Sequence, residues 1–218
     1  CVAELSRRTG RPVKISLTRE EVYYTHRGRH PAKMWIKTGV RADGTLTGLE
    51  LRMFLDGGAF SSFGIATAYY AGSLLPLTYK LPAYKYDGIR VFTNKPPCGP
   101  KRGHGAPQPR FAWEIQLDKI GEDLGIDPIE LRRRNLIEPY STTLNSLRVS
   151  SCGLRECLDK VAAASGWQKR CNSLPPGKGL GVAASAYLSG TGTTMWHPEL
   201  PHSGAHVQLD RAGGVTVF

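Results

Sequence analysis

The amino-acid sequence predicts an α+β fold in which antiparallel hairpins pack against helices. Asp43-Gly44 joins two runs of alternating apolar residues, at 33–40 and 46–55, and Asp-Gly in that setting is a strong hairpin signal. Apolar residues then recur at helical spacing over residues 111–124. Strands and helices do not alternate in the pattern of βαβ units, and no dinucleotide-binding glycine fingerprint is present.

The first segments of the chain mix helical and extended patterns. Residues 2–9 predict the tail of a helix that stops at Gly10. The alternating residues 13–17 predict a strand, and residues 18–21 predict a short turn or helix.

Two histidines lie four residues apart, at His26 and His30. That spacing suits a metal pair only on a helix, and both Gly28 and Pro31 oppose a helix here. We therefore expect the two histidines to make surface or interface contacts.

Residues 65–75 form a helix-like stretch without charges, which predicts burial on most sides. Its adjacent tyrosines, Tyr69 and Tyr70, cannot share one face, so one of them can point into a cavity. A core tyrosine with a satisfied hydroxyl is the commoner alternative. Residues 84–92 predict another strand.

The best-marked helix follows Asp127, which is placed to cap it, with Pro128 at the first helical position and Glu130 at the third. We expect this helix to run over residues 129–136. It contains the three consecutive arginines 132–134, a run that is most often a solvated face or an interface.

A polar stretch at residues 138–151 suggests a boundary, and it divides the chain into a first unit of residues 1–140 and a second of residues 141–218. The second unit is predicted to contain a helix, a strand, a small-residue loop and a final hairpin, at residues 154–164, 180–188, 189–194 and 205–218.

Composition limits the function classes. The net charge of +11 suggests an acidic partner: nucleic acid, a phosphate-bearing small molecule or another subunit. The basic residues are scattered and no nucleic-acid-binding signature accompanies them, so a basic nucleic-acid-binding module is the weaker alternative.

The five cysteines have no metal-ligand spacing, which favours free thiols in a reducing cytoplasm. We find no signal peptide and no apolar run long enough to cross a bilayer. The chain opens on Cys1 inside a helical pattern and closes on a strand at Phe218, so we expect a piece of a longer polypeptide.

One loop carries the clearest functional pattern. Residues 94–111 contain five prolines and three glycines around Arg102 and His104. Gly103 and Gly105 clear space on both sides of His104 for a flat ligand, and Arg102 and exposed N–H groups can bind anionic oxygen. The residues predict an anionic or cofactor-binding loop and identify no reaction; an ordinary ordered connection is the plainer alternative.

The run at residues 101–108 resembles the Arg-Gly-Phe-Gly-Gly-Pro-Gln loop of the xanthine dehydrogenase and aldehyde oxidase family of molybdenum hydroxylases. Similar features extend over essentially the whole chain: Thr9–Lys14, Arg29-His30-Pro31, Tyr79–Pro82 and Leu131–Leu136. The resemblance implies an enzyme, and a fold that is part of the family's molybdenum-cofactor-binding domain.

Within the family, the chain resembles the large, molybdenum-carrying subunit of 4-hydroxybenzoyl-CoA reductases. The stretches that carry this narrower resemblance include Thr25–Arg29, Gly57–Ile65, Lys85–Gly88 and Arg102-Gly103-His104-Gly105. His104 replaces an aromatic residue of the substrate slot of xanthine-oxidising relatives, and Tyr70 lies where they have a substrate-binding arginine. Both departures argue against a purine substrate.

By this resemblance, the reaction is reductive dehydroxylation of 4-hydroxybenzoyl-CoA, with His104 and Tyr70 as catalytic residues flanking the aromatic ring. Arg102, Gly103 and Gly105 would bind a molybdopterin cytosine dinucleotide cofactor with molybdenum. An iron–sulfur subunit and an FAD subunit would be partners, in a dimer of heterotrimers, with an aromatic acyl-CoA as substrate. The alternative enzyme is a molybdenum hydroxylase acting on an aldehyde or an N-heterocycle.

The family's Gly-Phe-Gly cofactor loop is expected just before Cys1, and its Gln-Gly loop and late catalytic glutamate beyond Phe218. We therefore expect the chain by itself to hold no molybdenum.

Overall fold

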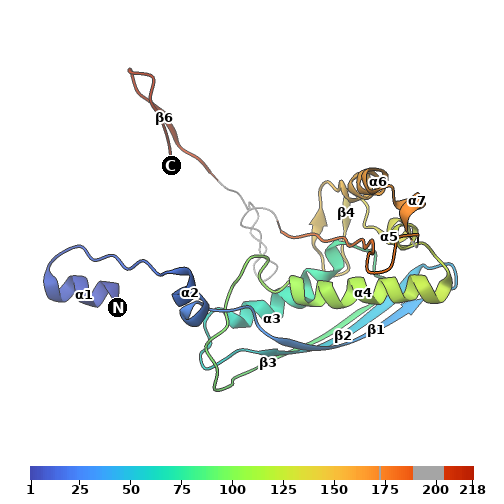
Figure 1. Ribbon diagram of the computed structural model, residues 1–218, viewed down its shortest axis with the longest axis horizontal. Helices are drawn as coiled ribbons and strands as arrows, with labels where there is room; N and C mark the ends of the chain where they lie inside the picture. The colour runs from blue at the N-terminus through green and yellow to red at the C-terminus, as the bar shows by residue number, and fades with distance from the viewer. Residues whose placement is uncertain (172, 189–203) are drawn as a thin grey trace.

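The computed structural model describes residues 1–171, 173–188 and 204–218, and its centre is a three-stranded sheet. The strands are β1 (Ala32–Val40), β2 (Leu46–Asp56) and β3 (Tyr84–Val91), in the order β1-β2-β3. Two helices, α3 (Gly64–Ser73) and α4 (Pro107–Leu124), cover one face of the sheet (Figure 1). The mixed helix-and-sheet class predicted from the sequence is confirmed.

The predicted hairpin is β1 and β2, which pair antiparallel. Its turn forms as the residue types dictate: Gly44 adopts φ 85°, and the Asp43 side chain accepts a hydrogen bond from Thr45 N at 2.9 Å. Alternate side chains of β2 are buried, namely Leu49, Leu51, Met53 and Leu55.

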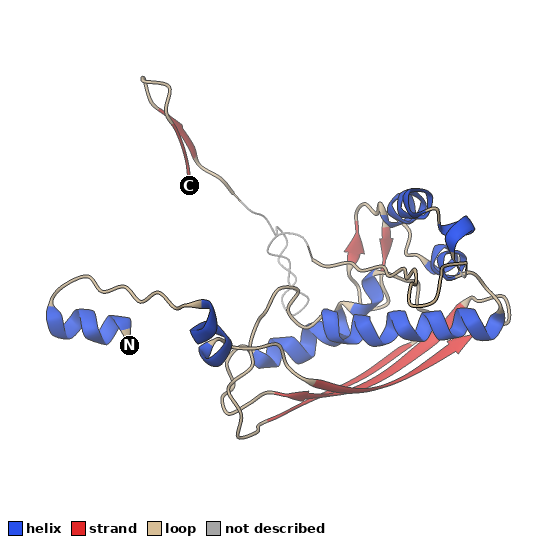
Figure 2. Ribbon diagram, viewed as in Figure 1, coloured by secondary structure: helices blue, strands red, loops and turns tan. Residues whose placement is uncertain are grey.

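The expectation of no βαβ unit was wrong. β3 pairs parallel to β2, and the connection between them contains α3 and the short 3₁₀ helix η1 (Leu75–Leu77) (Figure 2). Parallel neighbours require a crossover of this kind. The unit was missed because α3 is apolar on nearly every side and carries no helical periodicity, and because its connection lacks a phosphate-binding glycine fingerprint.

α4 and α5 (Pro128–Asn135) match the predicted helices. α4 starts before the predicted Phe111, with Pro107 at its first position. The α5 cap is confirmed, since the Asp127 side chain accepts hydrogen bonds from the N–H groups of Ile129 (2.8 Å) and Glu130 (3.1 Å).

The main core lies between the sheet and α4, where Leu49 and Leu51 meet Trp113 and Leu117. α6 (Leu154–Ser165) and α7 (Trp167–Arg170) add Leu158 and Trp167 to the same core. A two-stranded hairpin, β4 (Ser141–Thr142) and β5 (Arg148–Val149), occupies the polar stretch before α6.

The two ends of the chain project from this body (Figure 1). α1 (Val2–Thr9) buries no residue and ends at Gly10 in the left-handed conformation, as predicted. α2 (Arg19–Thr25) has a capping box at Thr18 and Glu21. The final hairpin, β6 (Val207–Leu209) and β7 (Val215–Val217), is confirmed and fully exposed.

Two predicted strands were wrong. Residues 13–17 are extended but have no strand partner among the described residues. Residues 180–188 keep the alternating exposure of a strand, yet no described segment pairs with them. A period-two pattern shows that a segment is half-buried and extended; a ladder also needs a neighbouring strand. The predicted loop at 189–194 lies outside the described residues.

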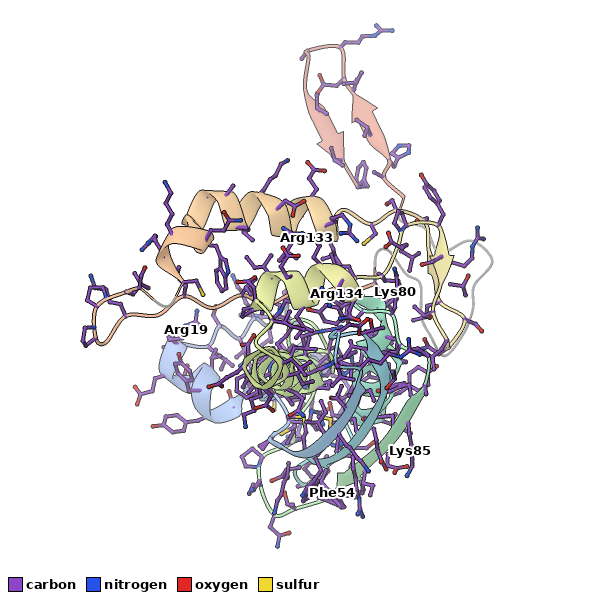
Figure 3. The ribbon with its side chains drawn as sticks, turned by 90° about the vertical axis from the view of Figure 1, so that its right-hand side faces the viewer. Arg19, Phe54, Lys80, Lys85, Arg133 and Arg134 are labelled. Carbon is purple, nitrogen blue, oxygen red and sulfur yellow. The ribbon has the colours of Figure 1, made fainter. Side chains whose placement is uncertain are left out.

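Residues 65–75 were predicted to be buried on most sides, and α3 departs from this on one face. Ile65 is 70% and Tyr69 38% exposed, whereas Ala66, Thr67 and Ala71 are buried. The sheet also keeps one face open. The side chains of Phe54 and Lys85 project from the sheet on the side away from α4 (Figure 3).

Among the described residues, no helix is both long and apolar enough to cross a membrane.

Candidate cofactor-binding site

Three segments that are distant in sequence meet at one end of the sheet: residues 26–31, 57–63 and 94–105. Cys98 N donates to Gly57 O at 3.0 Å, and Gly99 N donates to Gly28 O at 3.1 Å. The loop singled out in the sequence is therefore tied by its backbone to two other segments, which gives it a fixed shape.

Gly58 shows how closely these segments approach. It adopts φ 70°, and a Cβ built on it would lie 2.2 Å from Pro96 O. The neighbouring Ala59 N donates to Lys95 O at 3.0 Å. A side chain at position 58 would push the loop away, so glycine is required both for the backbone conformation and for the approach.

Asp56, at the end of β2, anchors the beginning of the loop. Its carboxylate accepts hydrogen bonds from Thr93 Oγ1 and Lys95 Nζ, each at 2.5 Å, and from Gly58 N at 3.1 Å. These bonds, with the Lys95 contribution largest, lower the pKa of Asp56 to about 2.

Arg90, on β3, lies beneath the turn at residues 57–64. Its Nε donates to His30 Nε2 at 3.1 Å, and its Nη2 donates to Gly57 O at 2.9 Å and to Phe60 O at 3.0 Å. His30 is buried because it packs under this turn. The expectation of a surface or interface contact is therefore wrong for His30. Burial first, and then the charge of Arg90, lower the pKa of His30 to about 4. His26 is exposed, as expected.

Arg29 connects this support to the candidate loop, since its Nη2 donates to Arg102 O at 2.8 Å. Arg102 itself is exposed, with its side chain free to face a ligand. No hydrogen bond joins the backbone N–H groups of residues 101–105 to any described residue. Two arginines and a row of unpaired N–H groups together suit anionic oxygen.

The start of α4 adds little to this row. Pro107 and Pro109 have no N–H, so two of the first three helical positions cannot donate. Among the described residues, the N–H groups without partners therefore lie in the loop before the helix, and anion binding by Arg102 and these groups stays a prediction.

His104 contacts one face of α3. Its Nε2 lies 2.7 Å from Thr67 Oγ1, and its ring centroid is 5.4 Å from that of Tyr70 and 5.7 Å from that of Phe63. The structure therefore brings the two residues predicted to be catalytic, His104 and Tyr70, into direct contact. Burial lowers the pKa of His104, and a hydrogen bond with the Phe63 backbone works in the opposite direction.

The glycines around His104 have a different physical role from the predicted one. Gly105 (φ 84°) faces α3, where a Cβ would lie 2.6 Å from Thr67 O. A Cβ built on Gly103 (φ 82°) would lie 3.1 Å from Pro107 Cγ. The space beside Gly105 is thus filled by the helix backbone, and this glycine lets the loop pack on α3.

A cavity of about 580 Å³ lies on the other side of the loop, between α4 and residues 181–187. Gly103 lines it, together with Pro107, Phe111, Arg110 and Tyr187, whereas His104 and Tyr70 do not. The pair predicted to be catalytic thus does not line this cavity, although Tyr187 in its wall interacts with Tyr70.

A buried ionic network below this cavity was not found from the sequence. Glu114 accepts hydrogen bonds from Arg132 Nε and from Tyr79 Oη, both at 2.9 Å. Arg132 is fully buried, so the prediction of a solvated arginine run is wrong at its first position. Arg133 stays partly exposed and pairs with Asp159 at 2.6 Å. A glutamate at the inner face of a predicted helix was the available signal.

No group of His, Cys, Asp or Glu in the described part of the chain is arranged to hold a metal ion. The cysteines that were expected to be free are free. Molybdenum held through a pterin requires no such protein ligand set, so the loop fits an anionic cofactor better than a bare ion.

The chain belongs to the molybdopterin cofactor-binding domain family, whose model matches residues 1–136. It is similar to a xanthine dehydrogenase molybdenum-binding subunit of Escherichia coli O157:H7, with 37% identity over 214 residues, 95% of this chain and 28% of that protein. It is also 31% identical to an aldehyde oxidoreductase of Megalodesulfovibrio gigas over 222 residues, 99% of this chain and 24% of that protein.

Among solved structures, quinoline 2-oxidoreductase from Pseudomonas putida 86 superimposes with a TM-score of 0.80 at 28% identity. The match covers 99% of this chain and 30% of that one. The chain therefore has the fold of a molybdenum hydroxylase cofactor-binding domain and spans less than a third of the length of these relatives.

Proposed function

We propose that this chain forms one wall of the molybdenum site in a hydroxylase that oxidises an aldehyde or an N-heterocycle. The loop at residues 101–105 carries the proposal, because its backbone N–H groups have no partner among the described residues and Arg29 and Arg102 lie beside them. When bound, a molybdopterin cofactor would supply two-electron redox chemistry at molybdenum, while its oxygen ligands and phosphates present the anionic groups that such a loop binds.

In this proposal Arg102, Gly103 and Gly105 form the cofactor-binding part of the chain. Arg102 donates to anionic oxygen, and the left-handed backbone conformation of Gly103 (φ 82°) and Gly105 (φ 84°) sets the shape of the loop. Arg29 acts through its bond to Arg102 O and holds the loop in place.

His104 and Tyr70 are proposed to flank a flat substrate. Burial keeps the His104 ring neutral near pH 7, so one ring nitrogen can donate a hydrogen bond and the other can accept one. Tyr70 adds an aromatic face and a phenolic hydroxyl.

The proposed substrate class follows the relatives, which are named for xanthine, aldehyde and quinoline oxidation. A second candidate is reductive dehydroxylation of 4-hydroxybenzoyl-CoA. It is favoured by one observation, the contact between His104 and Tyr70, since two hydrogen-bonding rings side by side suit a phenolic substrate.

For the whole protein we further propose a cofactor, partner subunits and a unit boundary. The cofactor is a molybdopterin cytosine dinucleotide. An iron–sulfur subunit and an FAD subunit pass electrons to or from it, in a dimer of heterotrimers. The first cofactor-binding unit ends near residue 140, which the family match over residues 1–136 supports.

The test uses the purified full-length protein and compares Arg102→Met with Lys101→Met, a neighbouring exposed cation. Elemental analysis should find stoichiometric molybdenum in wild type and Lys101→Met, and about tenfold less or lower in Arg102→Met, because charge-assisted hydrogen bonds are lost. Equal molybdenum in both variants would overturn the role of Arg102, and no molybdenum in wild type would overturn the function.

Substrate class is tested by assaying the same preparation with an aldehyde, an N-heterocycle and 4-hydroxybenzoyl-CoA. Turnover of either of the first two supports the main proposal. Turnover of the thioester alone supports the second candidate and excludes the first.

A further inference from the structure

We infer that Thr67 is the positioning residue of His104, holding its ring against α3 and fixing which ring nitrogen carries the proton. The inference rests on the proposed function, in which His104 faces the substrate. Thr67 itself is 1% exposed and cannot touch a substrate.

The Thr67 hydroxyl is committed to His104. Its Oγ1 lies 2.7 Å from His104 Nε2. Other helical threonines of this chain donate to the carbonyl four residues earlier, as Thr9 Oγ1 does to Leu5 O at 2.8 Å and Thr25 Oγ1 does to Glu21 O at 2.6 Å. Among the described residues, Thr67 has no such bond and no partner besides His104. Its proton is therefore available to His104.

The direction of this bond follows. Because the hydroxyl donates, Nε2 must accept, and the single proton of the neutral ring lies on Nδ1. A hydrogen bond of this kind favours the neutral ring, in the same direction as burial of His104. The ring also hydrogen-bonds the Phe63 backbone, which suits a ring N–H.

The His104 ring packs against one face of α3. Phe63, Thr67 and Tyr70 follow one another at helical spacing, and the two aromatic rings flank His104 on either side of the hydroxyl. Gly105 makes the contact possible, since any side chain there would strike Thr67 O and lift the loop from the helix. Ring position, ring orientation and tautomer are thus set by α3 before any ligand binds.

The test compares Thr67→Val, which keeps the shape and removes the hydroxyl, with Thr67→Ser, which keeps the hydroxyl. The readout is hydrogen–deuterium exchange at the imidazole Cε1–H of His104, measured against pH by mass spectrometry in the purified full-length protein. Trypsin releases residues 103–110 as a peptide in which His104 is the only histidine, so the signal is assigned without further variants.

In Thr67→Val we expect the His104 pKa to rise by about half to one unit, the shift that corresponds to one lost hydrogen bond. Thr67→Ser should keep the wild-type value. Circular dichroism should show both variants folded. An unchanged pKa in Thr67→Val, or equal shifts in both variants, overturns the inference, because loss of packing alone would not separate serine from valine in this way.

A second measurement keeps the inference testable should the valine variant unfold. The tautomer of wild-type His104 is read from its ring ¹⁵N shifts after selective histidine labelling, with His104→Asn for assignment. A protonated Nδ1 and an accepting Nε2 support the inference, and the reverse overturns it. Neither readout needs bound cofactor, so the inference can fail while the molybdenum content still supports the proposed function.

Discussion

Glu114 and Arg132 form a buried ion pair, in which Arg132 Nε donates to Glu114 Oε2 at 2.9 Å and the arginine is 0% exposed. Tyr79 Oη and Ala184 N donate to the same carboxylate, at 2.9 and 3.1 Å. Glu114, a side chain of α4, thereby joins α5, Tyr79 two residues after η1, and the segment at 180–188. The pair fixes the elements that support the loop at residues 94–105.

We expect Glu114→Gln to destabilise this contact between helices strongly, because it removes the buried carboxylate that pairs with Arg132 and leaves the guanidinium only the half-exposed carboxylate of Asp118, at 2.8 Å. The local free energy of opening of α4 and α5 should fall by about 3–5 kcal/mol. Native-state hydrogen exchange of peptides from these two helices measures it. Glu138→Gln is the matched control, since it breaks the exposed pair with Lys80 and should cost no more than about 1 kcal/mol. Equal effects would show that burial of the Glu114 pair has no energetic consequence.

Gly58→Ala should displace the loop as well as strain the backbone. A Cβ at Gly58 would meet Pro96 O at 2.2 Å, whereas Gly177 has a similar φ of 82° and open space around it. Gly177→Ala should therefore cost roughly 1–3 kcal/mol from backbone strain alone. Gly58→Ala should cost more and should also lower the molybdenum content of the full-length protein. Calorimetry and elemental analysis test the pair, and retention of wild-type molybdenum in Gly58→Ala would contradict the expectation.

His30 should make stability depend on mildly acidic pH. Its folded pKa of about 4 lies below the ordinary 6.5, so between these values the unfolded chain binds a proton that the folded chain excludes. The His30 contribution is complete above pH 6.5 and is lost as pH falls towards 4. Asn at position 30 cannot titrate, so His30→Asn should show a smaller drop in melting temperature between pH 7 and pH 5 than wild type. An unchanged drop would assign the dependence to other groups.

Arg29→Gln should loosen the loop without removing Arg102. The Arg29 Nη2 bond to Arg102 O is lost, and this bond to a charged donor corresponds to about tenfold in the population of the open loop. Limited trypsin digestion reports that population through cleavage after Arg102. Arg27→Gln is the control, since Arg27 binds Ser62 Oγ at 2.8 Å and not the loop backbone. Equal cleavage rates in the two variants would remove Arg29 from this role.

The sequence was sufficient wherever a local rule decides the outcome. The Asp43-Gly44 turn, the Asp127 cap and the Gly10 stop each depend on one residue and its immediate neighbours, and each formed as expected. The Arg102 and His104 loop was found for the same reason, since its prolines and glycines mark a fixed backbone. Its N–H row is indeed unpaired among the described residues.

The sequence was insufficient where a partner segment decides. Residues 13–17 and 180–188 alternate like strands and have no strand partner among the described residues, and β3 lies parallel to β2 although no βαβ unit was expected. Arg132 and His30 belong to charged or polar residue types that usually lie at the surface, yet Glu114 and Arg90 pair with them in the interior.

What the sequence by itself determined is the chemistry of the candidate site: an arginine, a histidine and a run of glycines and prolines in one loop. Only the tertiary structure decided the structural role of Gly105 and the orientation of the His104 ring. Because Gly105 has no side chain, the loop can pack directly on the backbone of α3, and Thr67 holds His104 against that helix. The physical reason is that these contacts join residues about forty positions apart, and no local pattern encodes a distance across the fold.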